Sequence, residues 1–290
     1  MYKKIITFLA IVAAIIFLLL CYVEKRGEDS VEKTNKGTTR TLFVFEKAAL
    51  PSTPKEQIEA KVEHMTLEEK VGQMFLVRCP EENVLEDIST YHLGGYIFFA
   101  RDFKEKTKAQ VTEAIQGYQA VSKIPMLMSV DEEGGQVNRI SIYPQFRAVP
   151  FWSSRALYQE GGWDLIESDT EEKCELLASL GLNVNMAPVC DVTTDASAYI
   201  YERTFGGDGE KNGEYVSRVV KVMRDKKIGS VLKHFPGYGN NTDTHSGISY
   251  DTRPYTTFEE SDFLPFQTGI AAGAGAVLVS HNIISSMDPD

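Results

Sequence analysis

The amino-acid sequence predicts an α/β fold, more specifically a (β/α)8 barrel of the TIM type that is incomplete at its C-terminal end and follows an N-terminal transmembrane helix. Two patterns predict the barrel. Short apolar runs alternate with helix-compatible segments, and polar side chains follow each run directly. Such runs are typical of parallel strands that are covered on both faces. We therefore expect one domain over residues 55–290, a barrel without its last part.

The expected elements begin with a helix at residues 66–70, where Thr66 caps the first turn and Glu69 reaches back to the cap. Six apolar runs are expected to be strands: residues 73–77, 95–99, 126–130, 184–189, 230–232 and 276–279. Residues 106–122 and 171–180 are compatible with helices between them. A closed barrel of this type needs eight strands. We expect that the sequence stops before the last two.

Polar side chains occupy the same place in each repeat, directly after the apolar run. They are Arg78, Arg101, Asp102, Asp131, Glu132, Asp191, Lys233, His234 and His281. The carboxyl ends of the strands line one mouth of a barrel, where its active site lies. A doubly wound sheet would instead carry a phosphate-binding glycine turn, and none follows the first run. The pattern therefore favours a barrel.

The first residues predict a membrane anchor. Residues 5–23 are apolar except for Thr7, and charged residues flank them on both sides. This length is close to the ~20 residues that cross a bilayer as a helix, and it exceeds the apolar stretch of most cleaved signal peptides. We expect a signal anchor over residues 1–24, a polar tether over 25–54, and a single-pass protein of the cell membrane with an extracytoplasmic catalytic domain. Cleavage of the anchor and lipid modification of Cys21 stay open.

The charge balance argues against nucleic acid as a partner. The 290 residues carry a formal net charge of -11 without a basic stripe, and an acidic surface repels phosphate backbones. The cysteines Cys79, Cys174 and Cys190 are widely spaced, which matches neither a disulfide framework nor a zinc pattern. We expect buried free thiols, and no metal or other cofactor.

Residues 232–247 have the composition of an active-site loop. Lys233, His234, Asp243 and His245 surround a glycine-rich stretch that directly follows an apolar run. The backbone freedom of such a loop, at the mouth of a rigid scaffold, lets several polar groups converge on one small ligand. The sequence therefore predicts that this loop contributes to a functional site.

Five ordered motifs resemble those of glycoside hydrolase family 3. They are residues 131–139 (DEEGGQVNR), 187–192 (APVCDV), 202–206 (ERTFG), 233–237 (KHFPG) with 243–245 (DTH), and 280–281 (SH). Within the family, the motifs are most similar to those of the NagZ-type β-N-acetylhexosaminidases. The resemblance implies a barrel fold and a carbohydrate substrate. The implied activity is hydrolysis of terminal β-linked N-acetylglucosamine from glycans such as peptidoglycan fragments.

The resemblance also implies a set of substrate-binding residues. It places Asp131, Arg203, Lys233 and His234 around the outermost sugar, with His281 as a further lining residue. The chemistry of these side chains agrees with that role. Hydrogen bonds that involve a charged group are roughly twice as strong as neutral ones, so charged donors and acceptors hold sugar hydroxyls well.

For the catalytic step, the resemblance makes His245 the acid/base and Asp243 its partner. Most glycosidases use two carboxyl groups, so a histidine acid needs a reason. Imidazole, with an ordinary pKa of ~6.5, donates a proton near neutrality, and Asp243 would orient the ring and favour its charged form. The resemblance places the nucleophile, an aspartate, beyond residue 290. The implied mechanism is double displacement with retention.

Three other interpretations stay open. A non-catalytic module that binds cell-wall glycans would keep the sugar-binding residues without turnover. A metal-dependent barrel hydrolase would hold its ion with Asp243 and His245 together with His234 and His281, since imidazole and carboxylate suit zinc. A phosphorylase would use phosphate in place of water as the acceptor.

Overall fold

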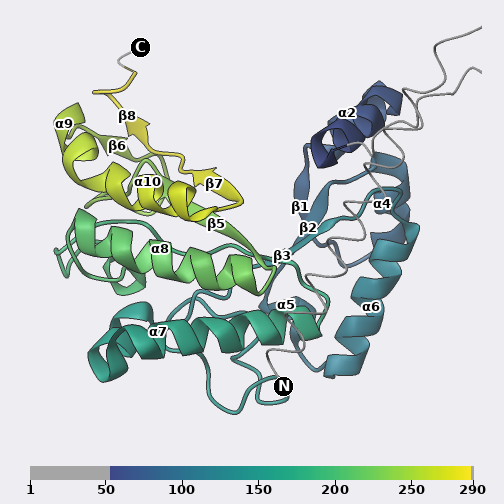
Figure 1. Ribbon diagram of the computed structural model, residues 1–290, viewed down its shortest axis with the longest axis horizontal. Coiled ribbons are helices and arrows are strands. Elements are labelled where there is room, and N and C mark those ends of the chain that lie inside the picture. Colours follow the sequence, from purple (N-terminus) through teal and green to yellow (C-terminus); the bar gives the residue numbers. More distant parts are fainter. Residues whose placement is uncertain (1–52, 289–290) are drawn as a thin grey trace, which may run out of the picture. The chain divides into compact units, whose positions relative to one another are not determined.

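The structure is a computed structural model that describes residues 53–288, nearly all of which belong to a compact unit over Lys55–Asp290 (Figure 1). The strands are β1 (Leu76–Arg78), β2 (Gly95–Phe98), β3 (Leu127–Val130), β4 (Val184–Asn185), β5 (Gly229–Phe235), β6 (Tyr250–Asp251), β7 (Ala276–Val279) and β8 (Ile283–Ile284). The helices are α2 (Pro54–His64), α3 (Leu67–Gln73), α4 (Val84–Tyr91), α5 (Ala100–Phe103), α6 (Lys108–Val121), α7 (Ser154–Ser179), α8 (Gly209–Asp225), α9 (Tyr255–Thr257) and α10 (Phe263–Ala272), with the short turns η1 (Tyr201–Arg203) and η2 (Phe258–Asp262).

Six strands form one parallel sheet in the order β1-β2-β3-β4-β5-β7, and β6 pairs with β8 in a second, two-stranded sheet. The order follows the chain without a reversal, as in a barrel and unlike a doubly wound sheet. Helix α8 packs against α7 and α10, which lie on either side of it (Figure 1). The carboxyl ends of the six strands therefore come to one edge of a curled sheet.

The open sheet agrees with the predicted barrel that lacks its last part. Within residues 53–288 the sheet is open, because β1 pairs only with β2 and β7 pairs only with β5 in the six-stranded sheet. Closing a barrel of this type takes eight strands, so that the first can pair with the last. The described residues thus form a half-barrel of the TIM-like kind, as the sequence predicted.

The fold-class prediction needs correction in its transmembrane helix, and so does the membrane location that depended on that helix. Across residues 53–288, no helix combines the length and the apolar character that a membrane crossing requires. The anchor was predicted at residues 1–24 and the tether at residues 25–54, so the anchor and the tether up to residue 52 lie outside the described residues. The structure therefore gives no support for a single-pass protein of the cell membrane.

The six predicted strand positions all contain or adjoin an observed strand, and the predicted cap at Thr66 is confirmed. The Glu69 backbone N–H donates to Thr66 Oγ1 at 3.1 Å, and the Thr66 N–H donates to Glu69 Oε2 at 3.0 Å. The helix predicted at residues 171–180 is too short, because α7 begins at Ser154. Its earlier part contains Gly162, whose φ of 61° interrupts the helical backbone, and such a glycine conceals a helix in sequence patterns.

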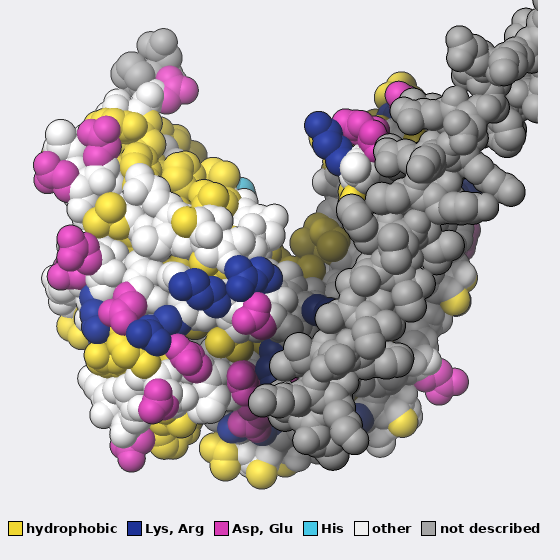
Figure 2. Space-filling model, in the orientation of Figure 1, with side chains coloured by type: hydrophobic (Ala, Val, Ile, Leu, Met, Phe, Trp, Pro, Cys, Tyr) yellow, Lys and Arg dark blue, Asp and Glu magenta, His cyan; other side chains and the backbone are white. Residues whose placement is uncertain are grey.

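The core lies between the sheet and its helices. Its largest wholly buried side chains include Tyr96, Phe103 and Phe151, and the three described cysteines are free and buried, as predicted. At the open end of the sheet, hydrophobic side chains stay exposed over α10 and β7 (Figure 2), among them Ile270 and Val279. Burial therefore differs along the sheet: most residues of β3 and β5 are buried, whereas those of the outermost strands, β1 and β7, are largely exposed.

Candidate active site

Lys233 is the centre of a buried charge cluster at the carboxyl ends of β3 and β5. Its Nζ lies 2.6 Å from Asp131 Oδ1 and 2.6 Å from Glu133 Oε1. The Lys233 side chain is only 2% exposed, and an ammonium so far from water needs paired anions around it. Because Asp131 and Glu133 follow β3 and Lys233 belongs to β5, the parallel sheet itself brings these charges together.

Arg203, from η1, extends the cluster. Its Nε donates to Glu133 Oε2 at 3.0 Å and its Nη2 donates to Glu133 Oε1 at 2.8 Å, a two-pronged bond that fixes both planar groups. The same Nη2 lies 3.2 Å from His234 Nε2. Arg203 therefore connects the carboxylate beside Lys233 with the imidazole of the next residue in β5.

His234 is oriented by Asp191, which follows β4. His234 Nδ1 lies 2.7 Å from Asp191 Oδ2, and a carboxylate there requires the proton on Nδ1, which leaves Nε2 of a neutral ring to accept from Arg203. The register of β5 against β7 shifts between Lys233 and Phe235. Such an irregularity redirects side chains, and it accounts for two consecutive residues that join one cluster.

Electrostatics keep Glu133 charged. Burial alone would raise the pKa of Glu133, but the charge of Lys233 and the hydrogen bonds from Arg203 lower it to about 2. Glu133 is 6% exposed and both of its oxygens are engaged, whereas Asp131 is 17% exposed and only its Oδ1 meets Lys233. Asp131 is therefore the carboxylate that has room for a ligand. We call Asp131, Glu133, Asp191, Arg203, Lys233 and His234 the buried cluster.

The pair Asp243 and His245 lies in the segment between β5 and β6, which we call the dyad loop (residues 236–249). Asp243 Oδ1 accepts from the His245 backbone N–H at 2.9 Å and lies 2.7 Å from His245 Nδ1. That backbone bond is the main cause of the lowered pKa of Asp243. The His245 side chain is 79% exposed, so its Nε2 points away from the pair and is free to meet a ligand.

Two tyrosines connect the pair with the buried cluster. The Tyr238 ring meets the His234 ring edge-on, with centroids 5.2 Å apart, and its hydroxyl lies 2.5 Å from Thr244 Oγ1. Tyr199 shares a hydrogen bond with Asp243, and its ring lies 5.8 Å from that of Tyr238. Among the described residues no hydrogen bond or ion pair joins His245 directly to the cluster. The structure therefore puts both on one rim without bringing them into contact.

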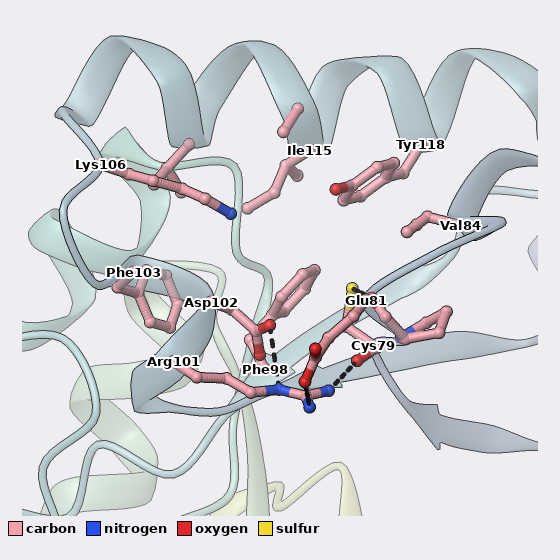
Figure 3. A pocket seen from close by; sticks show the side chains of 13 residues that line it. Cys79, Glu81, Val84, Phe98, Arg101, Asp102, Phe103, Lys106, Ile115 and Tyr118 are labelled. Carbon is pink, nitrogen blue, oxygen red and sulfur yellow. Dashed lines mark hydrogen bonds and ion pairs between the residues drawn. The ribbon is translucent and has the colours of Figure 1, made fainter.

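Other polar residues at strand ends share no hydrogen bond or ion pair with the buried cluster in the described part of the chain. His281 is exposed after β7. Arg101 donates to the Cys79 carbonyl at 2.7 Å and pairs with Glu81, beside a cavity of about 370 Å³ between the β1 and β2 ends and α6 (Figure 3). Tyr118 of α6 faces Cys79 across that cavity (Figure 3), and burial raises the pKa of the Cys79 thiol to about 12. This second set does not share a contact with the buried cluster in the part of the chain that is described.

Comparison with known proteins decides the family. The family described as "Glycosyl hydrolase family 3 N terminal domain" matches residues 66–290. The chain belongs to glycosyl hydrolase family 3. A protein named beta-hexosaminidase from Xylella fastidiosa (strain M12) is 33% identical over 204 residues, which cover 68% of this chain and 59% of that protein. The chain thus spans about 59% of the length of the curated relative that it matches.

Solved structures agree with the family 3 fold. A glycoside hydrolase family 3 beta-N-acetylglucosaminidase from Paenibacillus sp. str. FPU-7 superposes with a TM-score of 0.70 at 26% identity, over 78% of this chain and 44% of that chain. NagZ from Neisseria gonorrhoeae in complex with N-trifluoroacetyl-D-glucosamine superposes with a TM-score of 0.65 at 22% identity, over 74% of this chain and 64% of that chain. The latter similarity shows a shared fold.

Sequence analysis gave no role to Glu133 or Asp191, which belong to the buried cluster in the structure. Glu133 and Asp191 stand inside the quoted motifs, yet their partners, Arg203 and His234, are 70 and 43 positions away in the chain. Arg139 is a further case: its guanidinium lies 5.7 Å from the Phe99 ring, and its buried Nε has no hydrogen-bond partner among the described residues. The available signal was the buried acidic run that begins at Asp131.

The metal-binding alternative finds no support in this geometry. Within residues 53–288, no three side chains of His, Cys, Asp or Glu come together as a group that could hold an ion. His234 is engaged with Asp191 and Arg203, while His245 is engaged with Asp243 in the exposed loop. The four residues proposed as ligands are thus divided between different surroundings.

Proposed function

We propose that the chain contributes the sugar-binding and acid/base halves of a glycosidase that removes terminal β-linked N-acetylglucosamine from glycans such as peptidoglycan fragments. Membership of family 3 supports the reaction class. The observation that carries the proposal is the buried cluster, in which Lys233 and Arg203 hold Glu133 while Asp131 keeps an oxygen for a ligand. Preorganised charge of this kind holds sugar hydroxyls in one orientation.

In this proposal Asp131, Arg203, Lys233 and His234 surround the terminal sugar, and exposed His281 lines its edge. Asp131 accepts from a hydroxyl with its open oxygen. Arg203 and Lys233 keep Glu133 ionised, as its lowered pKa indicates. Because both buried cations are already paired, the cluster needs little rearrangement when a ligand arrives.

His245 then acts as the acid that protonates the leaving oxygen and, in the second half of the reaction, as the base that activates water. Asp243 orients the ring through the bond to Nδ1 at 2.7 Å, so that Nε2 carries the transferred proton. The attacking carboxyl group, which the family resemblance places beyond Asp290, is not assigned to a described residue.

Two measurements test the proposal. Calorimetric titration with N-acetylglucosamine should show binding that Asp131→Asn weakens about tenfold or more, the scale expected when a charged hydrogen-bonding partner is lost. Asp169→Asn is the matched control, because Asp169 forms an equally short and buried pair with Lys173 at 2.6 Å, in α7. Equal weakening by both variants would contradict a sugar site at Asp131.

Turnover is tested with an aryl N-acetyl-β-glucosaminide on a protein that also carries the nucleophile. His245→Ala should reduce hydrolysis by a factor of about 10² to 10⁴, the usual contribution of general acid–base catalysis. Near-normal turnover would contradict the assigned acid. Sugar binding without any turnover in the unsubstituted protein would instead identify a glycan-binding module.

A further inference from the structure

Arg253 lies beneath the dyad loop and holds both of its ends. Its Nη2 donates to the carbonyl of Gly237, at the start of the loop, at 3.1 Å. Its Nε and Nη2 donate to Asp251, in β6 just after the loop, at 3.0 and 2.8 Å. Its Nη1 donates to Asp262 Oδ1 at 2.9 Å, in η2. A single guanidinium therefore joins the entry of the loop, its exit and the helix behind it.

The backbone of the loop fits closely against this group. A Cβ on Gly239 would come within 2.5 Å of Arg253 Cζ, and one on Gly237 within 2.3 Å of Asp262 Oδ1. Both glycines have positive φ, 53° and 126°, a region that other residues rarely adopt. Glycine is therefore required at both positions for two reasons, the positive φ and the close approach of the ion-paired side chains. The loop backbone packs against Arg253 and Asp262 without space for a side chain.

The two carboxylates that pair with Arg253 are deeply buried. The Asp251 side chain is 1% exposed and that of Asp262 is 3% exposed, whereas Arg253 is 26% exposed. Asp251 Oδ2 also accepts from Asn241 Nδ2 at 2.7 Å, which attaches a second point of the loop. Charge-assisted bonds of this density in a buried setting give a rigid support.

Further contacts connect the base of the loop with Asp243 and His245. Between the two anchored glycines lies Tyr238, whose N–H donates to Asp191 Oδ1 at 2.8 Å and whose hydroxyl meets Thr244, next to Asp243. His245 itself is exposed, and among the described residues it forms hydrogen bonds only with Asp243. Its position relative to the buried cluster is therefore decided at the base of the loop.

We propose that Arg253 is a positioning residue: by joining Gly237, Asp251 and Asp262 it sets where the dyad loop presents His245 to the bound sugar. The inference rests on the proposed function in that His245 is the acid. Arg253 does not touch the sugar in this scheme. Its removal should therefore loosen the loop and impair the chemical step while the binding of N-acetylglucosamine at Asp131 stays unchanged.

Hydrogen exchange measured by mass spectrometry tests the anchoring without any need for turnover. In Arg253→Ala, amides of the dyad loop should exchange about tenfold faster or more, since a locally opened segment loses its protection, and peptides from β1 to β3 should be unchanged. Arg224→Ala is the control, an exposed arginine that donates to the Ala272 carbonyl. Unchanged exchange in the loop would overturn the proposal.

Arg253→Lys covers the case in which the alanine variant fails to fold. Lysine retains the charge but lacks the planar fork that reaches three partners together, so loop exchange should again be faster in a folded protein. Wild-type protection with lysine would overturn the proposal.

Kinetics separate positioning from a general loss of structure. In a protein that hydrolyses the aryl glycoside, both Arg253 variants should lower kcat with KM changed less than about twofold, the pattern of an interaction that acts only on the transition state. A rise in KM alone would overturn the assignment. If even the unsubstituted protein lacks turnover and sugar binding, the proposed function fails, and the exchange data still decide whether Arg253 anchors the loop.

Discussion

The buried cluster and the dyad loop differ in how they are held, although both belong to one rim. In the cluster, Lys233 and Glu133 are 2% and 6% exposed and each has two charged partners. In the loop, His245 is 79% exposed and depends on one neighbour two residues away. The difference teaches that, in the proposed function, the scaffold itself holds the sugar-binding groups, while the proton donor depends on the contacts of an exposed loop.

A second contrast, between two buried carboxylates, shows what the charge balance does. Glu133 faces two cations, and its pKa is lowered to about 2. For Asp262, burial raises the pKa to about 6, because its single cation, Arg253, is shared with Asp251 and other carboxylates lie near. The two side chains are buried to a similar depth, so the number of neighbouring cations decides whether the pKa falls or rises.

The largest expected effect comes from breaking the cluster at its centre. Lys233→Ala leaves two carboxylates buried without their cation and should lower the free energy of unfolding by about 3 to 5 kcal/mol. His245→Ala, at an exposed position, should change it by less than about 0.5 kcal/mol. Urea denaturation followed by circular dichroism measures both.

Lys173→Ala is the control for size and burial, because Lys173 pairs with a single carboxylate, Asp169. Lys173→Ala should lower the free energy of unfolding by less than Lys233→Ala does. If the Lys233 variant is as stable as the unsubstituted protein, the buried cluster contributes no more to stability than the dyad loop, which would contradict the comparison.

The next effect is a dependence on pH. Because the pKa of Glu133 falls from 4.5 to about 2 on folding, its contribution to stability is complete above pH 4.5 and is lost as the pH falls toward 2. Glu133→Gln should flatten that part of the stability curve, measured by urea denaturation between pH 2 and 7. Glu172→Gln is the control, since Glu172 pairs with Arg147 but is 53% exposed; a similar flattening there would contradict the role of burial.

A smaller effect is expected at Tyr238, which connects the buried cluster with the dyad loop. Tyr238→Phe removes the hydroxyl that meets Thr244 at 2.5 Å but keeps the ring against His234. We expect a loss of about 0.5 to 1.5 kcal/mol in unfolding free energy and faster hydrogen exchange confined to the dyad loop. Thr242→Val is a useful comparison, because the contact of Thr242 with Ser249 is long, 3.5 Å. Equal exchange in the two variants would argue against Tyr238 as a link.

The smallest effect is expected at His281. Its exposed side chain should contribute less than about 0.5 kcal/mol to stability, so His281→Ala should unfold like the unsubstituted protein. If it lines the sugar site, titration with N-acetylglucosamine should show weakening of less than about tenfold, below that of Asp131→Asn. Full retention of affinity would remove His281 from the proposed site.

Much of this arrangement follows from local patterns. The strand positions, the Thr66 cap and the buried thiols were predicted because each depends on residues that are close in sequence. The family was predicted from ordered motifs. The predicted membrane helix falls on residues that the structure does not describe, and the described helices are not of that kind.

The site could be predicted only in part, since motif residues were named without their partners. Nothing local indicates that Glu133 bridges Lys233 and Arg203, or that Arg253 reaches back to Gly237. The partners of a long-range ion pair are not regularly spaced in the chain, so no sequence pattern indicates them. Their geometry is decided when parallel strands align their ends.

By itself, the sequence determined which segments are apolar, which ends carry charge, and to which family the motifs belong, because these depend on residue type and spacing. The tertiary structure alone decided which charges meet, which are buried and how the two histidines differ. The physical reason is that pairing and desolvation act across space: His234 is buried against Asp191, while His245 stands in water.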